Sequence, residues 1–200
     1  MSESHQTARL DRRKAVARIL RNRGNALVVA SLGNPTYDVA AAGDVAQNFY
    51  LWGAMGGAVM LGFGLALAQP DRRVITFVGD GELMMGLGSL ATVAAHRPGN
   101  LSIVVIDNEH YAETGMQRAH TGRGVDLCGV ARAVGFSECH SVRTQDELES
   151  ITDSLLGAQH AVFASIKVST LPQPSSLPPR DGPYLRSRMR EALLGPAAHP

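Results

Sequence analysis

Two short polar motifs follow the two most apolar runs of the sequence. Gly79-Asp80-Gly81 comes directly after "RVITFV", and Asp107-Asn108 comes directly after "LSIVVI". Carboxylate and amide oxygens suit Mg²⁺, which usually takes one or two carboxylates and leaves its other positions to water and substrate phosphates. A glycine such as Gly81 lets the backbone approach a phosphate closely, and the free amides of a helix N-terminus attract the same anion. These residue types therefore indicate a site for a diphosphate bound through Mg²⁺.

A tight hairpin turn is the alternative interpretation of Asp80-Gly81, because Asp-Gly is a strong signal for such turns. The residues that follow, "ELMMGLGSLATVAA", have helical rather than alternating order. A return strand is therefore not available. The sequence favours a turn from a strand into a helix over a hairpin.

Two strands and one helix must position these motifs. Residues 73–80 and 101–108 are β-branched through their middle and too apolar to face water, so both are predicted to be strands inside a parallel sheet. The apolar spacing between them predicts one helix over residues 82–96, which completes a βαβ unit. Because the carboxyl ends of parallel strands meet at one edge of the sheet, Asp80 and Asn108 are expected to face the same ligand there.

The same alternation of strands and helices continues to residue 169. Further strands are predicted at 26–31, 48–52, 136–142 and 161–168, and further helices at 7–22, 125–134 and 146–156. Gly33, Asn34 and Pro35 predict a turn and then a loop after the first strand. This order predicts an α/β fold with three layers, α/β/α, around a mainly parallel sheet.

The last thirty residues differ from the rest in composition. Residues 171–183 are rich in proline and serine, and a short helix is predicted at about 184–194. We therefore expect a cofactor-binding domain over residues 1–170 and a proline-rich C-terminal arm with a short helix over 171–200.

Residues 51–68, "LWGAMGGAVMLGFGLALA", contain no charge over a length that is the lower limit for a membrane span. The spacing of Gly53 and Gly57 even resembles a helix-dimer motif of membranes. Five glycines nevertheless weaken this segment as a membrane helix, and the flanks lack an aromatic belt. A buried helix in an α/β protein is the favoured interpretation, so no membrane partner is expected.

Composition excludes several other classes of protein. Lysine plus arginine (19) nearly balances aspartate plus glutamate (18), so the chain lacks the strong positive charge that is typical of a nucleic-acid-binding protein. Cys128 and Cys139 are not in a CxxC motif, which argues against a zinc ribbon, an iron–sulfur site or a disulfide scaffold. The first twenty residues lack an uninterrupted apolar core and are not a secretory signal. A cytoplasmic protein with reduced thiols is expected.

The spacing of the polar motifs resembles a known fingerprint. GDG, twenty-five residues and then Asp107-Asn108 is similar to the thiamine-diphosphate motif, whose first asparagine is an aspartate here. "NFYLWGAMGGAVMLGFGLALAQP" resembles the glycine-rich segment that precedes this motif in thiamine-diphosphate-dependent 2-oxo acid decarboxylases. Within that family, "AGDVAQNFYLWGAMGGA", "GDGELMMGLGSLATVA" and "VIDNEHYAETGMQ" resemble the beta subunit of sulfopyruvate decarboxylase and the C-terminal domain of phosphonopyruvate decarboxylase. The resemblance covers roughly residues 8 to 170 and implies the thiamine-diphosphate-binding fold.

The resemblance implies the ligands of thiamine diphosphate and Mg²⁺. Asp80, Asn108 and the carbonyl of His110 would hold the metal. Gly81 and Glu82 would contact the diphosphate through their backbone. Gly79 and Tyr111 are also expected to bind the cofactor.

Met55 is expected to contact the ring end of the cofactor. By the resemblance, the carbonyl of Gly53 and the amide of Met55 bind the aminopyrimidine, with Ala54 between them, and the Met55 side chain is wedged between the two rings. An ordinary core methionine that fills a gap is the alternative. The surrounding glycines favour the wedge.

The loop after the second motif is expected to contact the substrate, because binding residues are often on loops at such edges. It contains His110, Glu113, Thr114, Gln117 and His120. Both imidazoles could transfer protons near neutral pH, but spacing alone does not show that either reaches a substrate. Met55, His110 and Glu113 are the predicted catalytic residues.

The resemblance also implies that the active site is shared. Family members activate the cofactor with a glutamate on a pyrimidine-binding domain, and this domain is not found in the sequence. A pyrimidine-binding alpha subunit is therefore expected to supply the glutamate, in an α2β2 or larger hetero-oligomer. The implied reaction releases CO2 and an aldehyde from a small 2-oxo acid.

Two alternatives to this function remain. A subunit of a carboligase similar to acetolactate synthase would use the same cofactor, and a non-catalytic cofactor-binding subunit would keep the fold without turnover. Ferredoxin-linked oxidoreductases share the fold, but the cysteines that a cluster needs are missing here.

One departure bears on the substrate. The related decarboxylases tend to have a serine-arginine-glutamate triplet after the first strand, whereas this sequence reads "GNPTYDV", with Tyr37 and Asp38 in place of the arginine and the glutamate. An anion-binding arginine is therefore missing from this position. The choice between a sulfonate, a phosphonate and another 2-oxo acid stays open.

Overall fold

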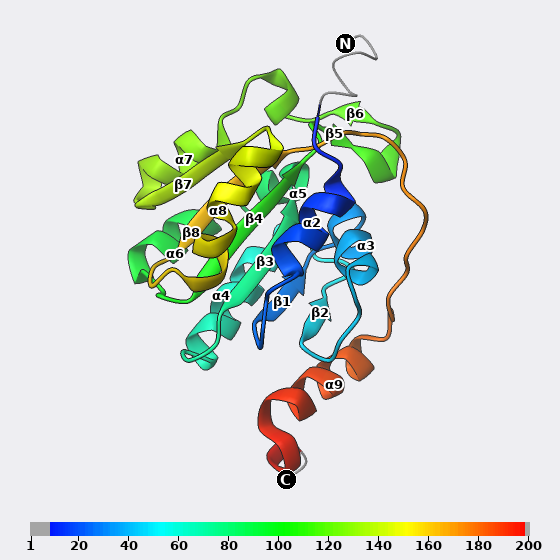
Figure 1. Cartoon of the computed structure of the whole chain (residues 1–200), viewed down its shortest axis with the longest axis vertical. Coiled ribbons are helices and arrows are strands. Elements are labelled where there is room, and N and C mark those ends of the chain that lie inside the picture. Colours follow the sequence, from blue (N-terminus) through cyan, green and yellow to red (C-terminus); the bar gives the residue numbers. More distant parts are fainter. Residues whose placement is uncertain (1–8, 199–200) are drawn as a thin grey trace.

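The computed structural model describes residues 9–198, which form a six-stranded parallel sheet with helices on both faces (Figure 1). The strand order is β2-β1-β3-β4-β8-β7, and every neighbouring pair is parallel. The strands are β1 (Leu27–Ala30), β2 (Asn48–Tyr50), β3 (Val74–Gly79), β4 (Leu101–Asp107), β7 (Glu138–Val142) and β8 (Val162–Lys167). The predicted α/β fold with a mainly parallel sheet is confirmed.

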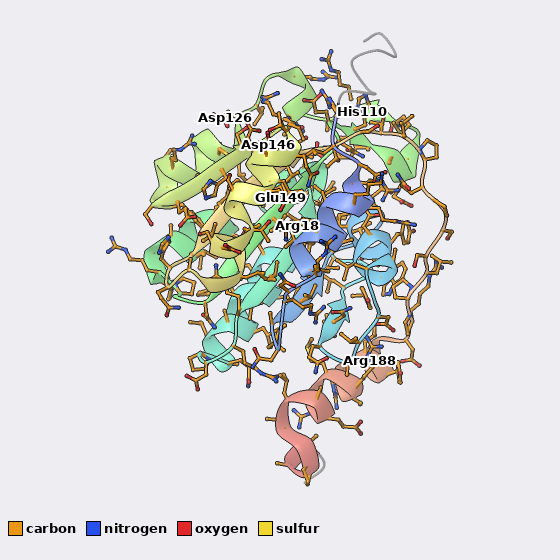
Figure 2. All side chains as sticks on the ribbon, in the orientation of Figure 1. Arg18, His110, Asp126, Asp146, Glu149 and Arg188 are labelled. Carbon is orange, nitrogen blue, oxygen red and sulfur yellow. The ribbon has the colours of Figure 1, made fainter. Side chains whose placement is uncertain are left out.

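The helices form two layers, one on each face of the sheet. One layer consists of α2 (Arg12–Leu20), α3 (Asn34–Ala41) and α8 (Gln145–Gly157). The opposite layer consists of α4 (Ala58–Ala68), α5 (Asp80–Met85), α6 (Ser89–His96) and α7 (Leu127–Val134). Arg18 on α2 pairs with Glu149 on α8, and both are labelled in Figure 2. Residues 7 and 8 of the first predicted helix lie outside the described residues.

The strands alternate their side chains between two hydrophobic cores. Ile75 and Phe77 of β3 pack under α2 and α8, whereas Val74 and Val78 pack under α4 and α6. All seven residues of β4 are buried. A strand that is covered on both faces must be apolar throughout, which is why these runs could be recognised in the sequence.

The loop predicted after β1 is wrong, because α3 begins there at Asn34. The turn is completed by Gly33 alone, whose φ of +61° is unfavourable for residues with a side chain. Pro35 lies in the first turn of α3, where its missing N–H costs no helical hydrogen bond. The proline therefore begins a helix here rather than ending one.

The uncharged segment is helical only from Ala58, and the preceding residues form an irregular turn. Trp52, Ala54 and Gly56 all have positive φ, at 57°, 49° and 89°. The expectation of one buried helix over residues 51–68 is therefore wrong for its first seven residues. No helix within residues 9–198 is long and apolar enough to cross a membrane.

The single helix predicted over 82–96 is also wrong, because α5 ends at Met85 and α6 begins at Ser89. A Cβ atom on Gly86 would lie 2.1 Å from the carbonyl oxygen of Gly56. The break between the two helices thus lies where their backbone crosses the turn before α4. Periodicity within one segment could not indicate this contact.

Gly62 and Gly64 provide a matched test of how α4 packs on the sheet. A Cβ at Gly62 would lie 1.9 Å from Oγ1 of the buried Thr76, whereas a Cβ at Gly64 meets no atom within 4 Å. We expect Gly62→Ala to lower the free energy of unfolding by about 1–3 kcal/mol through overpacking. Gly64→Ala should raise it by about 0.5–1 kcal/mol, because alanine is the better helix former. Urea unfolding of both variants measures this difference, and equal effects would contradict the packing of α4.

The C-terminal arm runs along the outside of the molecule to α9 (Gly182–Leu194), as the orange segment of Figure 1 shows. The indole Nε1 of Trp52 donates a hydrogen bond of 2.7 Å to the Pro179 carbonyl. Leu185 on α9 is buried, and Arg188, labelled in Figure 2, pairs with Asp44. The predicted short helix is present, while the division of the chain into domains at residue 170 remains a prediction.

The smaller elements lie around the loop after β4 and at the C-terminal end of the described chain. They are β5 (His110–Tyr111), η1 (Ala112–Thr114), β6 (Gln117–Arg118), η2 (Thr121–Arg123) and η3 (Gly195–Ala198). β5 and β6 pair as a short antiparallel hairpin. This hairpin carries the loop in which substrate contacts are expected.

Candidate active site

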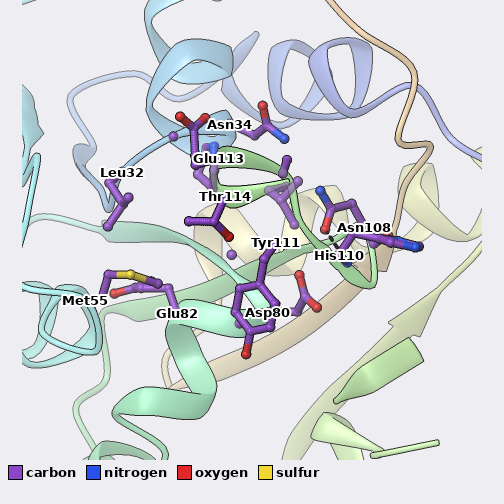
Figure 3. A pocket seen from close by; sticks show the side chains of 16 residues that line it. Leu32, Asn34, Met55, Asp80, Glu82, Asn108, His110, Tyr111, Glu113 and Thr114 are labelled. Carbon is purple, nitrogen blue, oxygen red and sulfur yellow. Dashed lines mark hydrogen bonds between the residues drawn. The ribbon is translucent and has the colours of Figure 1, made fainter. Parts of the chain in front are cut away.

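A pocket lies at the carboxyl ends of β1, β3 and β4, and Figure 3 shows its side chains. It brings together nine of the predicted site residues, which are Met55, Gly79, Asp80, Gly81, Glu82, Asn108, His110, Tyr111 and Glu113. Gly53 and Ala54 do not line it, but they belong to the turn that carries Met55. Residues far apart in the sequence thus meet at the edge of the sheet where ligands bind in such folds.

Sequence reasoning missed one wall of the pocket, formed by residues 32–35. These residues follow β1 and lead into α3, whose N-terminus has no side-chain cap. The rule that placed Asp80 and Asn108 at strand ends applies equally to the end of β1. It could have identified Gly33 and Asn34, had α3 been recognised.

Asp80 lies at the start of α5 and is 2% exposed. The hydroxyl Oγ1 of Thr121 lies 2.8 Å from Oδ2 of Asp80 and 2.8 Å from Oδ1 of Asp107. A hydroxyl has one hydrogen and can donate it to only one of the two carboxyl groups. The second contact is a hydrogen bond only when one of the two carboxyl groups is protonated and donates its hydrogen to the Thr121 hydroxyl oxygen.

Asp107 replaces the first asparagine of the fingerprint and is 1% exposed. Its Oδ2 lies 2.6 Å from Nζ of Lys167, which also lies 2.9 Å from Oε1 of Glu109. Arg9 completes this group by pairing with Glu109. The extra negative charge of Asp107 is therefore balanced by a buried lysine on β8, as a buried charge requires.

Burial and, after it, the charge of the neighbouring Asp107 together raise the pKa of Asp80 to about 7. The unfolded chain loses this proton near its ordinary value of 3.8, so between about pH 4 and 7 only the folded chain retains it. Ionised Asp80 is therefore disfavoured in the metal-free fold, and this group's contribution to stability decreases as pH rises through that range.

This pKa predicts how the stability of the metal-free chain depends on pH. Relative to Asp80→Asn, wild-type protein should lose about 2–3 kcal/mol of unfolding free energy between pH 5 and 7.5. Urea unfolding of both proteins at the two pH values, without divalent cations, measures the difference. A difference that does not change with pH would show that Asp80 titrates normally.

Asn108 and His110 are fixed by the sharp turn after β4. Oδ1 of Asn108 accepts a hydrogen bond of 2.9 Å from the His110 amide, and Nδ1 of His110 lies 2.9 Å from the Asn108 carbonyl. Glu109, between them, has a φ of 65°. Figure 3 shows Asn108 and His110 on the same side of the pocket as Asp80. The imidazole of His110 is thus tied to backbone.

The residues present fit a Mg²⁺-bound diphosphate. No group of three or more His, Cys, Asp or Glu residues within the described chain could hold a metal ion, but Mg²⁺ needs only one or two carboxylates beside neutral oxygens. The N-terminus of α5 has no side-chain cap and its first residues line the pocket, so this helix start offers an anion site. A Cβ at Gly79 would meet no atom within 4 Å, which leaves open space beside Asp80.

Gly81 has a close neighbour of its own. A Cβ atom there would lie 2.2 Å from Cε1 of Tyr111. The phenol of Tyr111 lies 3.4 Å from Nδ1 of His120. The glycine is therefore required for the Tyr111 ring to pack over the start of α5, in addition to any phosphate contact.

Glu113 lies on the loop opposite Asp80, beside the N-terminus of α3. A Cβ at Gly33 would be 3.0 Å from both Cγ and Oε1 of Glu113. Thr114 and Glu113 line the pocket, whereas Gln117 and His120 do not. The roles predicted for Glu113 and the His110 imidazole remain predictions.

Asp38, one of the two departures from the family triplet, faces away from this pocket. It is fully buried and forms ion pairs with Arg12 and Arg13 on α2. Asp38 therefore holds α3 against α2. No lysine or arginine lines the described part of the pocket.

A parallel α/β sheet whose acidic and amide-lined edge lies beside a helix N-terminus is typical of domains that bind a phosphorylated ligand. Comparison with known proteins identifies the family. Residues 31–168 match the C-terminal TPP-binding domain of the thiamine pyrophosphate enzymes, and the chain belongs to this family. The resemblance inferred from the motifs is confirmed.

Three similar proteins illustrate the range of the family. The sulfopyruvate decarboxylase subunit beta of Methanothermobacter thermautotrophicus is 40% identical over 159 residues, which cover 80% of this chain and 82% of that subunit. The phosphonopyruvate decarboxylase of Streptomyces hygroscopicus is 44% identical over 133 residues, covering 66% of this chain but 32% of that enzyme. The structure of a thiamine diphosphate-dependent 4-hydroxybenzoylformate decarboxylase from Rhodococcus jostii superposes with a TM-score of 0.67 at 21% identity, over 81% of this chain and 33% of that one. The structural match supports the fold alone.

Proposed function

We propose that the chain is the diphosphate-binding beta subunit of a thiamine-diphosphate-dependent 2-oxo acid decarboxylase. The observation that carries this proposal is the meeting of Asp80, Asn108 and Met55 in one pocket beside the uncapped start of α5. The 40% identity to a sulfopyruvate decarboxylase subunit beta, over 82% of that subunit, supports this assignment.

In this proposal, the chain's own residues hold and orient the cofactor. Asp80, Asn108 and the His110 carbonyl would bind Mg²⁺, and the amides of Gly81 and Glu82 would bind the diphosphate. The cofactor supplies the electron sink that lets a 2-oxo acid lose CO2.

The ring end of the cofactor would be bound by the turn before α4. Gly53, Ala54 and Met55 would contact the aminopyrimidine, and Tyr111 would lie beside the diphosphate. Met55 is 42% exposed at the pocket, which is unusual for a core methionine and supports its role as a wedge.

A partner subunit would supply the glutamate that activates the cofactor ring. The carboxyl groups that line the described part of the pocket belong to Asp80, Glu82 and Glu113. Asp80 is assigned to the metal, the Glu82 carboxylate is bound to the amides of Gly56 and Ala58, and Glu113 is assigned to substrate contact. An acid from outside this chain is therefore the simplest source, in an α2β2 or larger assembly.

An apolar surface beside the pocket supports such an assembly. Five large side chains on α4, α5 and the turn before α4 are each at least 36% exposed, namely Met55, Met60, Leu61, Leu67 and Met85. Clusters of this kind mark interfaces in soluble proteins. Of these five, Met55 lines the pocket, and it is at this part of the surface that the pyrimidine-binding subunit is expected.

The substrate would be a small 2-oxo acid, with Glu113 and the His110 imidazole as candidates for contact. The described pocket offers no lysine or arginine for a sulfonate or phosphonate group. The cation that such a substrate requires would have to come from the partner.

Product analysis tests the reaction. The complex with the pyrimidine-binding subunit is incubated with pyruvate, 3-sulfopyruvate or 3-phosphonopyruvate in the presence of thiamine diphosphate and Mg²⁺. The proposal predicts stoichiometric CO2 and free aldehyde from at least one of them. A condensed 2-hydroxy ketone without free aldehyde would instead identify a carboligase, and cofactor binding without product from any of the three would contradict this choice of substrates and favour a non-catalytic subunit.

A further inference from the structure

The turn that carries Met55 is conformationally strained. Trp52 and Ala54 have φ values of 57° and 49°, which residues with a side chain rarely adopt. Each such residue is strained and persists only where the surrounding structure holds it. Met55 follows Ala54 directly, so its position in the pocket depends on whatever holds this turn.

Glu82 provides the contacts that hold the turn. Its side chain is 5% exposed, and Oε1 accepts hydrogen bonds from the amides of Gly56 at 3.1 Å and Ala58 at 3.4 Å. These amides lie at the N-terminus of α4, which has no cap from its own segment. Glu82 therefore caps α4 from another helix, and its negative charge also favours the positive end of that helix.

The backbone of Gly86 supports the turn from the other side. A Cβ at Gly56 would lie 2.9 Å from the amide nitrogen of Gly86, so the two backbones are in direct contact. The turn is thus held between the Glu82 carboxylate and the end of α5. Asp80 begins the same helix.

We infer that Glu82 is a positioning residue, which sets the turn carrying Met55 and thereby fixes the ring end of the site relative to its metal end. The side chain then has a role separate from the backbone contact that the resemblance assigns to this residue. The consequence for cofactor geometry rests on the proposed function, whereas the stabilisation of the turn by Glu82 does not depend on that function.

Hydrogen exchange of the metal-free chain tests directly whether the Glu82 side chain holds the turn. Glu82→Ala should increase the exchange rates of the Gly56 and Ala58 amides by about tenfold or more, because each loses a charge-assisted hydrogen bond. Glu82→Gln keeps an oxygen that can accept both bonds, so its rates should stay within about threefold of wild type. Glu82→Asp shortens the side chain by one methylene, so its exchange rates should resemble those of Glu82→Ala. This variant is used in place of Glu82→Ala if the alanine variant does not fold.

Glu147→Ala is the matched control, because Glu147 accepts bonds from the Arg143 and Thr144 amides at the start of α8. It should increase exchange there and leave Gly56 and Ala58 unchanged. The fluorescence of Trp52, the single tryptophan of the chain, should shift in Glu82→Ala and not in Glu147→Ala. Unchanged exchange at Gly56 and Ala58 in Glu82→Ala would overturn the inference.

In the assembled complex, Glu82→Ala should lower kcat at least tenfold, and Glu82→Gln should restore most of it. The activity of the wild-type complex tests the proposed function. A complex that converts no 2-oxo acid would refute the proposed function but not the positioning role of Glu82. The exchange rates decide the positioning role whatever the activity shows.

Discussion

Replacing Asp80 with alanine is expected to weaken the Mg²⁺-dependent binding of thiamine diphosphate to the assembled complex by at least about 100-fold. Loss of a group that only supports a metal ligand already costs about 10–100-fold in affinity, so loss of the carboxylate ligand itself should cost more. Asp80 is the only aspartate that lines the described pocket. Isothermal titration with the cofactor, at saturating and at zero Mg²⁺, measures the change.

Asp153→Ala serves as the control for Asp80→Ala. Asp153 is an exposed residue of α8 on the opposite side of the sheet from α5, so its loss should leave cofactor affinity unchanged. If Asp80→Ala bound the cofactor as tightly as wild type, the metal assignment would be wrong. A loss of binding that is equal with and without Mg²⁺ would also contradict it.

Replacing Gly86 with alanine is expected to have the second largest effect. The new Cβ would lie 2.1 Å from the Gly56 carbonyl oxygen, and a backbone atom cannot move aside as a flexible side chain can. The turn carrying Met55 must therefore shift or the helices must separate. We expect a loss of about 2–4 kcal/mol in unfolding free energy, in the upper range of overpacking effects, together with weaker cofactor binding by the complex.

Gly88→Ala is the matched control, two residues further along the chain. Its Cβ would meet no atom within 4 Å, and its φ of −60° suits alanine. This variant should be neutral or slightly more stable than wild type in urea unfolding. Similar losses in the two variants would mean that the contact between Gly86 and Gly56 does not hold the turn.

The proximity of Asp80 and Asn108, the proposed metal end of the site, could be predicted from sequence because it depends on neighbouring parallel strands. β3 and β4 pair with Gly79 opposite Ile106. Asp80 and Asn108 therefore follow directly at adjacent strand ends. Apolar runs that end in polar residues can be recognised in the sequence. In a parallel sheet, the ends of neighbouring strands lie at the same edge, so these polar residues lie close together.

The turn at the proposed ring end of the site could not be predicted in the same way, because contacts between distant segments form it. The carboxylate of Glu82 reaches amides twenty-six and twenty-four positions earlier in the chain. Gly86 breaks a helix whose apolar periodicity continues through the break. Local patterns report which face of a helix is buried, but not where another backbone crosses it.

The hydrogen bond between Thr121 and Asp80 could not be predicted from the sequence either, because forty-one positions separate the two residues. Thr121 lies in a loop whose sequence carries no strand or helix pattern. The replacement of asparagine by Asp107 is visible in the sequence, whereas its balance by Lys167 depends on the pairing of β4 with β8. The environment that sets the pKa of Asp80 is thus a property of the folded chain.

The central claim is that this chain provides the metal and diphosphate end of an active site that another subunit completes. Its most direct test is the initial rate of CO2 release from pyruvate, 3-sulfopyruvate and 3-phosphonopyruvate with thiamine diphosphate and Mg²⁺. The rate is measured for the purified chain alone and after addition of the pyrimidine-binding chain of the same organism. We predict no release above background from the chain alone and rapid release from the mixture with at least one substrate. Full activity of the chain alone would contradict the claim.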